Sequence, residues 1–301
     1  MSDITFDNRV AIVTGSGGGL GKTYALELGR RGARVVVNDL GGSVDGTGAS
    51  SMAADAVVEE IRAAGGEAIA NYDSVSTPES GAAIVHAALE EWGQVDVLIN
   101  NAGILRDSSF AKMTTEQIDA VIDVHLKGAF YVTRPAFAAM KDASYGRIVN
   151  TSSPSGLFGN FGQVNYGAAK AGLMGMSSVM AIEGAKYNIK SNVIAPVAKT
   201  RMTEDLLGPL ADLVDPDQVM PLVVYLASEA CDLTHQVFSV GGGRYARVFL
   251  GVNQGWFAGQ GVVPSVEDIA TNLDTIQDVS DYAIPLNNTE EMALLYQALQ
   301  G

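Results

Sequence analysis

The chain has 301 residues, of which 47% are hydrophobic and 34 are glycine, and its net charge is −15 at pH 7. That length suffices for one large α/β domain, no apolar run is long enough to span a membrane, and the acidic balance would repel nucleic acid; we therefore expect neither a membrane nor a nucleic-acid partner. The single Cys231 excludes an internal disulfide and the first residues lack a signal-peptide pattern, so we expect a cytoplasmic protein.

The first part of the chain predicts a strand, a glycine-rich turn and a helix. The apolar run Val10 to Thr14 is followed by Gly15-Ser-Gly-Gly-Gly-Leu-Gly21 and by a helical pattern from Lys22 to Arg31. Glycines let the backbone approach a pyrophosphate, whose charge lies at the positive end of the helix. We therefore predict a dinucleotide site, with a glycine-rich loop that binds nothing as the alternative. Its predicted cofactor contacts are Gly15, Gly19, Leu20 and Gly21.

The second apolar run, Arg34 to Asn38, ends at Asp39, 18 residues after Gly21. An acidic residue roughly 20 residues after the glycine loop binds the ribose hydroxyls of a dinucleotide and repels a 2′-phosphate. No Arg or Lys lies between Gly15 and Gly21 to attract such a phosphate. The pattern predicts NAD rather than NADP. The alternative is that Asp39 only caps the turn Asp-Leu-Gly-Gly.

Further strands and helices alternate along the chain as far as residue 243. The expected strands are 67–71, 95–99, 147–151, 189–194 and 236–240, and the expected helices are 52–64, 78–92, 115–140, the one that begins at 164, and 216–228. We expect the long helix 115–140 to bend near Pro135. The alternation predicts an α/β fold, a doubly wound, Rossmann-like parallel sheet with helices on both faces. Ligands of such sheets bind at the carboxyl ends of the strands, where Asp39, Asp73, Asn100 and Ser153 fall.

Residues 244–301 form a short C-terminal extension to the predicted domain 1–243. They include a possible strand at 244–249, a capping-box pattern at Ser265-Val-Glu-Asp268 and an amphipathic stretch at 288–299. This segment is too small for a core of its own. We expect it to pack on the same domain or on a partner subunit.

The segment from Ser153 to Lys170 carries the candidate catalytic residues. A helix from Val164 onward places Tyr166 and Lys170 on one face, four residues apart. An ammonium near a phenol favours the phenolate, so we expect the pKa of Tyr166 to fall and the phenol to transfer a proton near neutral pH. A hydroxyl at Ser153, just after a predicted strand, could hydrogen-bond a substrate carbonyl or alcohol.

Taken together, these residues resemble a known family. Thr14-Gly-x-x-x-Gly19-x-Gly21, Asn100-Asn-Ala-Gly103, Ser153 and Tyr166-x-x-x-Lys170 are similar to the short-chain dehydrogenase/reductase pattern, from about Arg9 to Gly243. A closer resemblance is to the (3R)-hydroxyacyl-CoA dehydrogenase domains of peroxisomal multifunctional enzymes of type 2. Asn-Asp-Leu-Gly-Gly42 and Gly-Asn-Phe-Gly-Gln163 are among the similar stretches, and that family also carries a C-terminal extension.

The resemblance implies a role for each matching residue. Tyr166 is the general acid/base, Lys170 lowers its pKa and holds the nicotinamide ribose, and Ser153 orients the substrate oxygen. Asp73 contacts the adenine and Asn100 the cofactor backbone. The matching motifs add Ser74, Ala102 and Gly103 as cofactor contacts.

Two departures from the family pattern are visible. His125 stands where the family usually has Asn on the long helix, and either joins a proton relay or occupies a packed polar site. Val197 replaces the family's glycine after Pro196. We expect no metal site. Four basic residues are candidates for CoA phosphate contacts, although solvated surface charge explains them equally well: Arg106, Lys199, Arg201 and Arg244.

The leading hypothesis is an NAD-dependent oxidoreductase of lipid metabolism that interconverts (3R)-3-hydroxyacyl-CoA and 3-oxoacyl-CoA. The same chemistry on a 17β-hydroxysteroid, or on a steroid with a CoA-linked side chain, is the alternative. A non-catalytic NAD-binding module is a remote third hypothesis. The resemblance implies a homodimer, with a homotetramer as the alternative.

Overall fold

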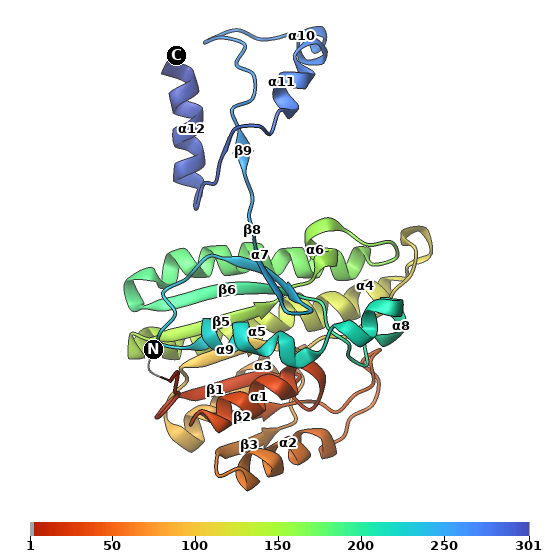
Figure 1. The fold of residues 1–301 in the computed structure, drawn as a ribbon, viewed down its shortest axis with the longest axis vertical. Helices are drawn as coiled ribbons and strands as arrows, with labels where there is room; N and C mark the ends of the chain where they lie inside the picture. The colour runs from red at the N-terminus through yellow and green to blue at the C-terminus, as the bar shows by residue number, and fades with distance from the viewer. Residues whose placement is uncertain (1–2, 301) are drawn as a thin grey trace. The chain divides into compact units, whose positions relative to one another are not determined.

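Seven parallel strands form the centre of the fold (Figure 1). The computed structural model describes residues 3–300, so Met1, Ser2 and Gly301 lie outside the described residues. With an eighth strand at one edge, the sheet order is β3-β2-β1-β4-β5-β6-β7-β8. The parallel strands are β1 (Val10–Thr14), β2 (Arg34–Asn38), β3 (Glu67–Asn71), β4 (Val97–Asn100), β5 (Gly146–Thr151), β6 (Ile189–Pro196) and β7 (Val237–Gly241).

The strand order reverses at β1, because β2 and β4 both pair with it on opposite sides. Val13 of β1 pairs with Val37 of β2 and with Ile99 of β4. Loops that leave neighbouring strands at such a reversal diverge to opposite faces, which opens a crevice at the carboxyl ends of the strands. The predicted α/β, Rossmann-like fold is confirmed.

Helices cover both faces of the sheet because alternate strand residues point in opposite directions. One apolar core joins the sheet to α1 (Gly19–Arg30), α2 (Met52–Ala63) and α9 (Met220–Ala227). The second core lies under α3 (Pro78–Trp92) and α5 (Gly128–Ala143). The helix that bears Tyr166, α7 (Val164–Gly184), packs beside α5 on that face.

The long helical stretch is irregular at Asp123–Lys127, where a π turn separates α4 (Thr115–Ile122) from α5. Pro135 instead lies inside α5, which continues through it to Ala143. A π turn that the sequence did not predict therefore lies eight to twelve residues before Pro135, and the bend expected near Pro135 stays a prediction. Single π turns are frequent at functional sites. This one carries the buried His125.

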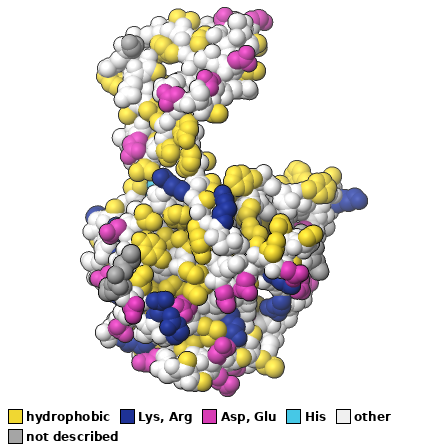
Figure 2. All heavy atoms as spheres, in the orientation of Figure 1, with side chains coloured by type: hydrophobic (Ala, Val, Ile, Leu, Met, Phe, Trp, Pro, Cys, Tyr) yellow, Lys and Arg dark blue, Asp and Glu magenta, His cyan; other side chains and the backbone are white. Residues whose placement is uncertain are grey.

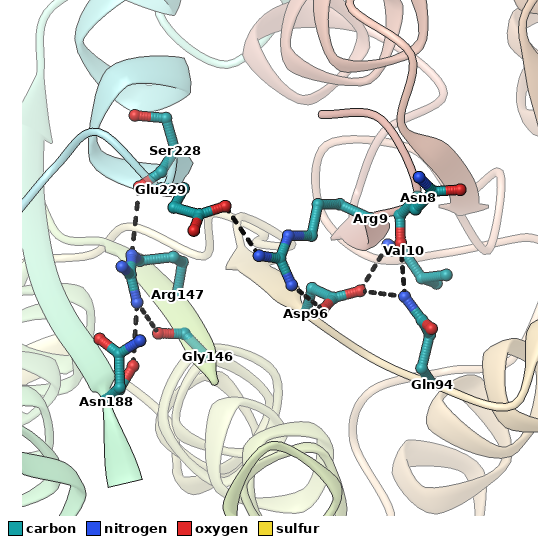
Figure 3. A network of polar contacts seen from close by, with 10 residues as sticks. All are labelled: Asn8, Arg9, Val10, Gln94, Asp96, Gly146, Arg147, Asn188, Ser228 and Glu229. Carbon is teal, nitrogen blue, oxygen red and sulfur yellow. Dashed lines mark hydrogen bonds and ion pairs between the residues drawn. The ribbon is translucent and has the colours of Figure 1, made fainter. Parts of the chain in front are cut away.

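Polar contacts join strand starts at the opposite, amino-terminal edge of the sheet (Figure 3). The Arg147 side chain is buried, and its guanidinium donates to three backbone carbonyl groups at 2.9–3.1 Å, those of Gly146, Asn188 and Ser228. The ring of Tyr145 lies 4.5 Å from this guanidinium and 3.7 Å from that of Arg9. Arg9 in turn pairs with Asp96 at 3.0 Å, and the Asp96 carboxylate also accepts from the backbone N–H of Val10. These contacts stabilise the sheet far from its ligand-binding edge.

The segment between β5 and the sheet edge contains short elements that the sequence did not predict. A five-residue helix, α6 (Pro154–Phe158), begins at Ser153, whose hydroxyl accepts from the backbone N–H of Ser155. After β6, α8 (Glu204–Leu207) and a 3₁₀ segment lead to α9. A two-residue turn with positive φ at Gly242 and Gly243 then joins β7 to β8 (Arg244–Val248).

The chain divides into two units, Met1–Arg247 and Val248–Gly301. The second unit contains β9 (Val252–Asn253), α10 (Val266–Thr271), α11 (Leu273–Gln277), β10 (Tyr282–Ala283) and α12 (Asn288–Gln300). The capping box at Ser265 is present, and Phe249 stacks on Tyr282. None of the described residues from 248 to 300 is buried within this unit. Its sequence has no Lys or Arg, and acidic and apolar side chains share its visible surface (Figure 2). Its packing partner stays a prediction.

Within the described residues, no helix is both long enough and apolar enough to cross a membrane.

Candidate functional site

A cleft of about 480 Å³ opens at the carboxyl ends of the strands. It is lined by the segments that follow β1 to β6, which bring together residues from positions 15 to 203. Most of the predicted site residues line this one cleft: Gly15, Gly19, Leu20, Asp39, Asp73, Ser74, Ala102, Gly103, Ser153, Tyr166 and Lys170. Two predicted cofactor contacts, Gly21 and Asn100, are not among its lining residues.

The glycine-rich loop turns sharply between β1 and α1. Gly15 has a φ of +63°, and a Cβ there would lie 2.7 Å from the Cα of Ala102. At Gly21, which is buried, a Cβ would lie 2.2 Å from the carbonyl oxygen of Gly15. Gly21 therefore serves the close packing of helix against loop, whereas Gly15, Gly18 and Gly19 form the open surface at the start of α1.

The Asp39 carboxylate lies at the end of β2 and faces this loop. One of its oxygens accepts from the backbone N–H of Gly17 and the other from that of Gly41, each at 2.7 Å. The second bond is the turn cap that the sequence allowed as an alternative. The first bond ties Asp39 to the glycine-rich loop, and its role in binding the ribose stays a prediction.

The Asn-Asn-Ala-Gly motif holds β4 against the glycine-rich loop. The Asn101 amide donates to the carbonyl groups of Thr14 and Gly15 at 3.0 and 2.9 Å. The Thr14 hydroxyl accepts from the backbone N–H of Asn101 at 3.0 Å. Asn100 points elsewhere, because its amide donates to Thr133 and Asn150 inside the fold. Asn101 was not predicted as a site residue, although it is part of this motif.

The adenine-side candidate Asp73 follows β3 in a compact turn. Its backbone carbonyl accepts from the Asn38 amide at 2.9 Å, and its carboxylate accepts from the Asn71 amide at 2.8 Å. Ser74 is next to it, and its hydroxyl is 2.8 Å from that of Ser76. Both residues line the cleft beside Asp39.

Ser153, Tyr166 and Lys170 meet at the other end of the cleft. Ser153 and Lys170 are buried, and the Lys170 Nζ lies 5.6 Å from the centre of the Tyr166 ring. The Lys170 ammonium donates to the backbone carbonyl of Thr151, at the end of β5. The predicted helix therefore places phenol and amine on one face, and α6 holds Ser153 next to them.

The pKa of Tyr166 is raised, which corrects the expectation that it falls. Burial is the main cause, since it disfavours the phenolate; interaction with the Ser153 hydroxyl lowers the pKa, and the Asp107 carboxylate raises it further. Burial also lowers the pKa of Lys170 to about 7. The ammonium that should stabilise the phenolate is therefore itself partly neutral at pH 7. Sequence spacing gives proximity but not the depth of burial that controls both groups.

His125 is the buried neighbour of this group. Its ring lies edge-on to the Tyr166 ring with centres 5.1 Å apart, and its Nε2 is 2.7 Å from the backbone oxygen of Ile104. Burial and the charge of Lys170 lower the pKa of His125 well below its usual value, so the ring is neutral. Its Nδ1 has no hydrogen-bond partner among the described residues. A packed polar site and a relay are both compatible with these contacts.

The segment after β6 supplies cleft residues that sequence reasoning did not assign to this place. Thr200, Arg201 and Met202 all line the cleft. The Thr200 side chain lies 3.4 Å from the position of a Cβ at Gly19. The Pro196 motif signalled a loop leaving the sheet, but it did not indicate that the loop crosses the start of α1.

The residues of the cleft fit a dinucleotide. Backbone N–H groups at the start of α1 attract an anion, and α1 has no acidic residue in its first turn. The glycines leave space that side chains would fill. Among the described residues, no group of three or more His, Cys, Asp or Glu side chains is arranged to hold a metal ion.

Comparisons with known proteins agree with this geometry. A family model described as short chain dehydrogenase matches residues 9–208. A short-chain type dehydrogenase/reductase of Mycobacterium tuberculosis is 53% identical over 274 residues, which are 91% of this chain and 95% of that protein. The peroxisomal hydratase-dehydrogenase-epimerase of Saccharomyces cerevisiae is 53% identical over 247 residues, which are 82% of this chain and 27% of that protein.

A solved structure extends the comparison to the whole chain. Full-length peroxisomal multifunctional enzyme type 2 from Drosophila melanogaster matches with a TM-score of 0.83 and 38% identity. The match covers 99% of this chain and 50% of the fly enzyme, so this chain spans about half the length of that relative. The resemblance to multifunctional enzymes of this type is confirmed.

Proposed function

Because the chain belongs to the short-chain dehydrogenase family, we propose that it is an NAD-dependent oxidoreductase that interconverts a secondary alcohol and a ketone. We propose (3R)-3-hydroxyacyl-CoA and 3-oxoacyl-CoA as the substrate pair. The observation that carries the proposal is the convergence of Ser153, Tyr166 and Lys170 in the cleft that Asp39 also lines. A pure binding module does not require a hydroxyl, a phenol and an amine in contact.

The preference for NAD rests on Asp39. Its carboxylate is held by the N–H groups of Gly17 and Gly41, so it cannot swing away from the ribose position without losing two hydrogen bonds. A fixed negative charge accepts hydrogen bonds from ribose hydroxyls and repels a 2′-phosphate.

The substrate class rests on relatives rather than on the cleft. Proteins about half identical to this chain are named peroxisomal hydratase-dehydrogenase-epimerase and peroxisomal multifunctional enzyme type 2. The first of those names couples a hydratase to a dehydrogenase, and a hydratase that acts on an enoyl thioester yields a 3-hydroxyacyl thioester. We carry over the dehydrogenase step alone, because this chain spans 27% and 33% of those two proteins.

The residues divide the work of proton transfer. The bound nicotinamide supplies the two-electron redox chemistry. The Ser153 hydroxyl hydrogen-bonds the reacting oxygen and orients it. Tyr166, held as a neutral phenol by burial, gives its proton to a ketone oxygen and takes a proton back from the alcohol in the opposite direction. Protonated Lys170, 5.6 Å from the phenol ring, favours the phenolate that this return step requires.

The test compares NAD and NADP side by side on a 3-hydroxyacyl-CoA and on a 17β-hydroxysteroid, with NADH or NADPH absorbance as the readout. Tyr166→Phe should lower kcat about 10²- to 10⁴-fold, the usual contribution of general acid/base catalysis, while the Kd for NADH stays within about twofold. Tyr187→Phe, on a half-buried tyrosine outside the cleft, is the matched control and should leave kcat unchanged. Full activity in Tyr166→Phe removes the assigned acid/base. Faster turnover of the steroid selects the alternative substrate.

Assembly and location are separate proposals. We propose a homodimer, with the apolar second unit, residues 248–300, as the segment that gains most from a partner subunit. We propose the cytoplasm as the location, and cell fractionation distinguishes it from the peroxisome named for several relatives.

A further inference from the structure

One arginine of the cleft has a position that the proposed function does not yet use. Arg201 follows Thr200 on the loop after β6, is exposed, and lines the cleft. Its Nη2 lies 3.9 Å from the position that a Cβ at Gly18 would occupy. Gly18 is the residue immediately before α1, so the guanidinium lies over the amino end of that helix.

The other basic side chains that line the described cleft are engaged elsewhere. The Lys170 ammonium donates to the Thr151 carbonyl beside Tyr166. The Arg106 Nε donates at 2.9 Å to the backbone carbonyl of Asp45, in the loop after β2. Arg201 forms no ion pair with any of the described side chains. Among the described side chains that line the cleft, Arg201 is therefore the cation available at the glycine-rich loop.

A pyrophosphate at this loop needs positive charge in a protein whose net charge is −15. Helix N–H groups supply partial charge, and α1 has no acidic residue in its first turn to offset it. Lys22, the fourth residue of α1, pairs with Glu60 at 2.8 Å. A guanidinium supplies a full charge and two parallel N–H donors, which match phosphate oxygens. The segment that carries Arg201 also places Thr200 against Gly19, which holds the guanidinium near the helix end.

We propose that Arg201 binds the pyrophosphate of the dinucleotide, from the loop after β6 and across the start of α1. This assignment replaces the sequence-based idea that Arg201 contacts CoA phosphates, since its guanidinium lies at the cofactor loop. It rests on the proposed dinucleotide function but not on the choice between NAD and NADP, because both nucleotides carry the same pyrophosphate.

The test measures the Kd of ADP-ribose, which has the pyrophosphate, and of adenosine, which lacks it, for the full chain. Arg201→Gln should raise the Kd of ADP-ribose and of NADH about tenfold, which is the contribution of one charge-assisted hydrogen bond at an exposed site. The Kd of adenosine should be unchanged. Arg201→Lys keeps the charge but loses the paired donors and should give an intermediate Kd. Added salt should weaken NADH binding to the unmodified protein more than to Arg201→Gln.

Lys199→Gln is the matched control. It removes one positive charge from the same loop, but Lys199 pairs with Asp212 at 3.0 Å and is not among the residues that line the cleft. This variant should keep the Kd of ADP-ribose within about twofold of the unmodified value, since exposed charges beyond contact distance are screened. Thermal unfolding of each variant checks that the fold is retained.

Three results would overturn the assignment. Equal Kd values of ADP-ribose for Arg201→Gln and the unmodified protein exclude a pyrophosphate contact. Equal weakening of adenosine and ADP-ribose indicates a distorted cleft instead. An unchanged NADH Kd with a raised KM for the acyl-CoA assigns the guanidinium to the substrate. An unmodified protein that prefers NADPH refutes the proposed cofactor while leaving the Arg201 comparison intact.

Discussion

Replacing Lys170 by methionine should make the ligand-free protein more stable at neutral pH while it removes catalysis. The Lys170 side chain is buried, and burial alone lowers its pKa from 10.5 to about 7. Folding therefore disfavours its charged form. Methionine keeps most of the apolar stem and removes the titrating group.

The magnitude follows from the pKa gap. At about 1.36 kcal/mol per pKa unit, the gap between 10.5 and about 7 costs the folded protein about 4 kcal/mol at pH 7. The substitution also removes the hydrogen bond to the Thr151 carbonyl, which lowers the expected gain in stability by about 1 kcal/mol. Lys170→Met should therefore raise the free energy of unfolding by about 3 kcal/mol at pH 7.

The sign of the pH dependence is set by the direction of the shift. The folded pKa lies below the unfolded one, so the unfolded chain binds more protons between pH 7 and 10.5. The penalty is complete below pH 7 and disappears as the pH rises toward 10.5. The advantage of Lys170→Met should therefore shrink by about 2 kcal/mol between pH 7 and pH 9.

The assay is urea unfolding of the ligand-free protein and of Lys170→Met at pH 7 and pH 9, at one protein concentration. Lys141→Met, at an exposed lysine of α5, is the control and should show the same difference from the unmodified protein at both pH values. The reasoning fails if Lys170→Met is less stable at pH 7, or if its difference from the unmodified protein is the same at pH 9. NADH absorbance should show the accompanying loss of turnover.

Three other outcomes follow from particular contacts. Asp39→Ala should weaken the binding of NADH about tenfold and reduce the preference for NADH over NADPH, because the carboxylate that accepts from the ribose and repels a 2′-phosphate is lost. Nucleotide titration measures both Kd values, and an unchanged ratio between them contradicts this prediction. Arg147→Met should lower the free energy of unfolding by about 2–4 kcal/mol, because three buried carbonyl groups lose their donor, while the NADH Kd is unchanged; urea unfolding tests this, with exposed Arg134→Met as control. Sedimentation should give twice the chain mass, whereas the chain mass itself rules out the homodimer.

Local sequence patterns predicted much of the fold and part of the candidate site. The β1, β2 and β3 strands begin and end where the apolar runs do, and the capping box at Ser265 is present as predicted. The first strand end, the glycine loop and α1 are neighbours in the sequence, so their geometry follows from local chemistry. The spacing of Tyr166 and Lys170 on α7 follows in the same way from helical periodicity.

Long-range contacts explain what the sequence missed. The motif predicts Asn100 as a cofactor contact, which stays a prediction, but it did not indicate that the Asn100 amide donates to Thr133 of α5 and Asn150 of β5. The sequence did not predict the π turn at His125, whose ring nitrogen lies 2.7 Å from the backbone oxygen of Ile104, 21 residues earlier. Tertiary packing brings such partners together, and the local sequence does not predict them.

The sequence by itself determined the order of strands and helices and which residues are candidates for the chemistry, because both depend on neighbours along the chain. Only the tertiary structure decided the protonation of Tyr166 and Lys170 and the approach of Arg201 to the start of α1. Burial depends on side chains from distant segments, and the loop after β6 reaches Gly18 only because strand pairing brings β6 and β1 into one sheet.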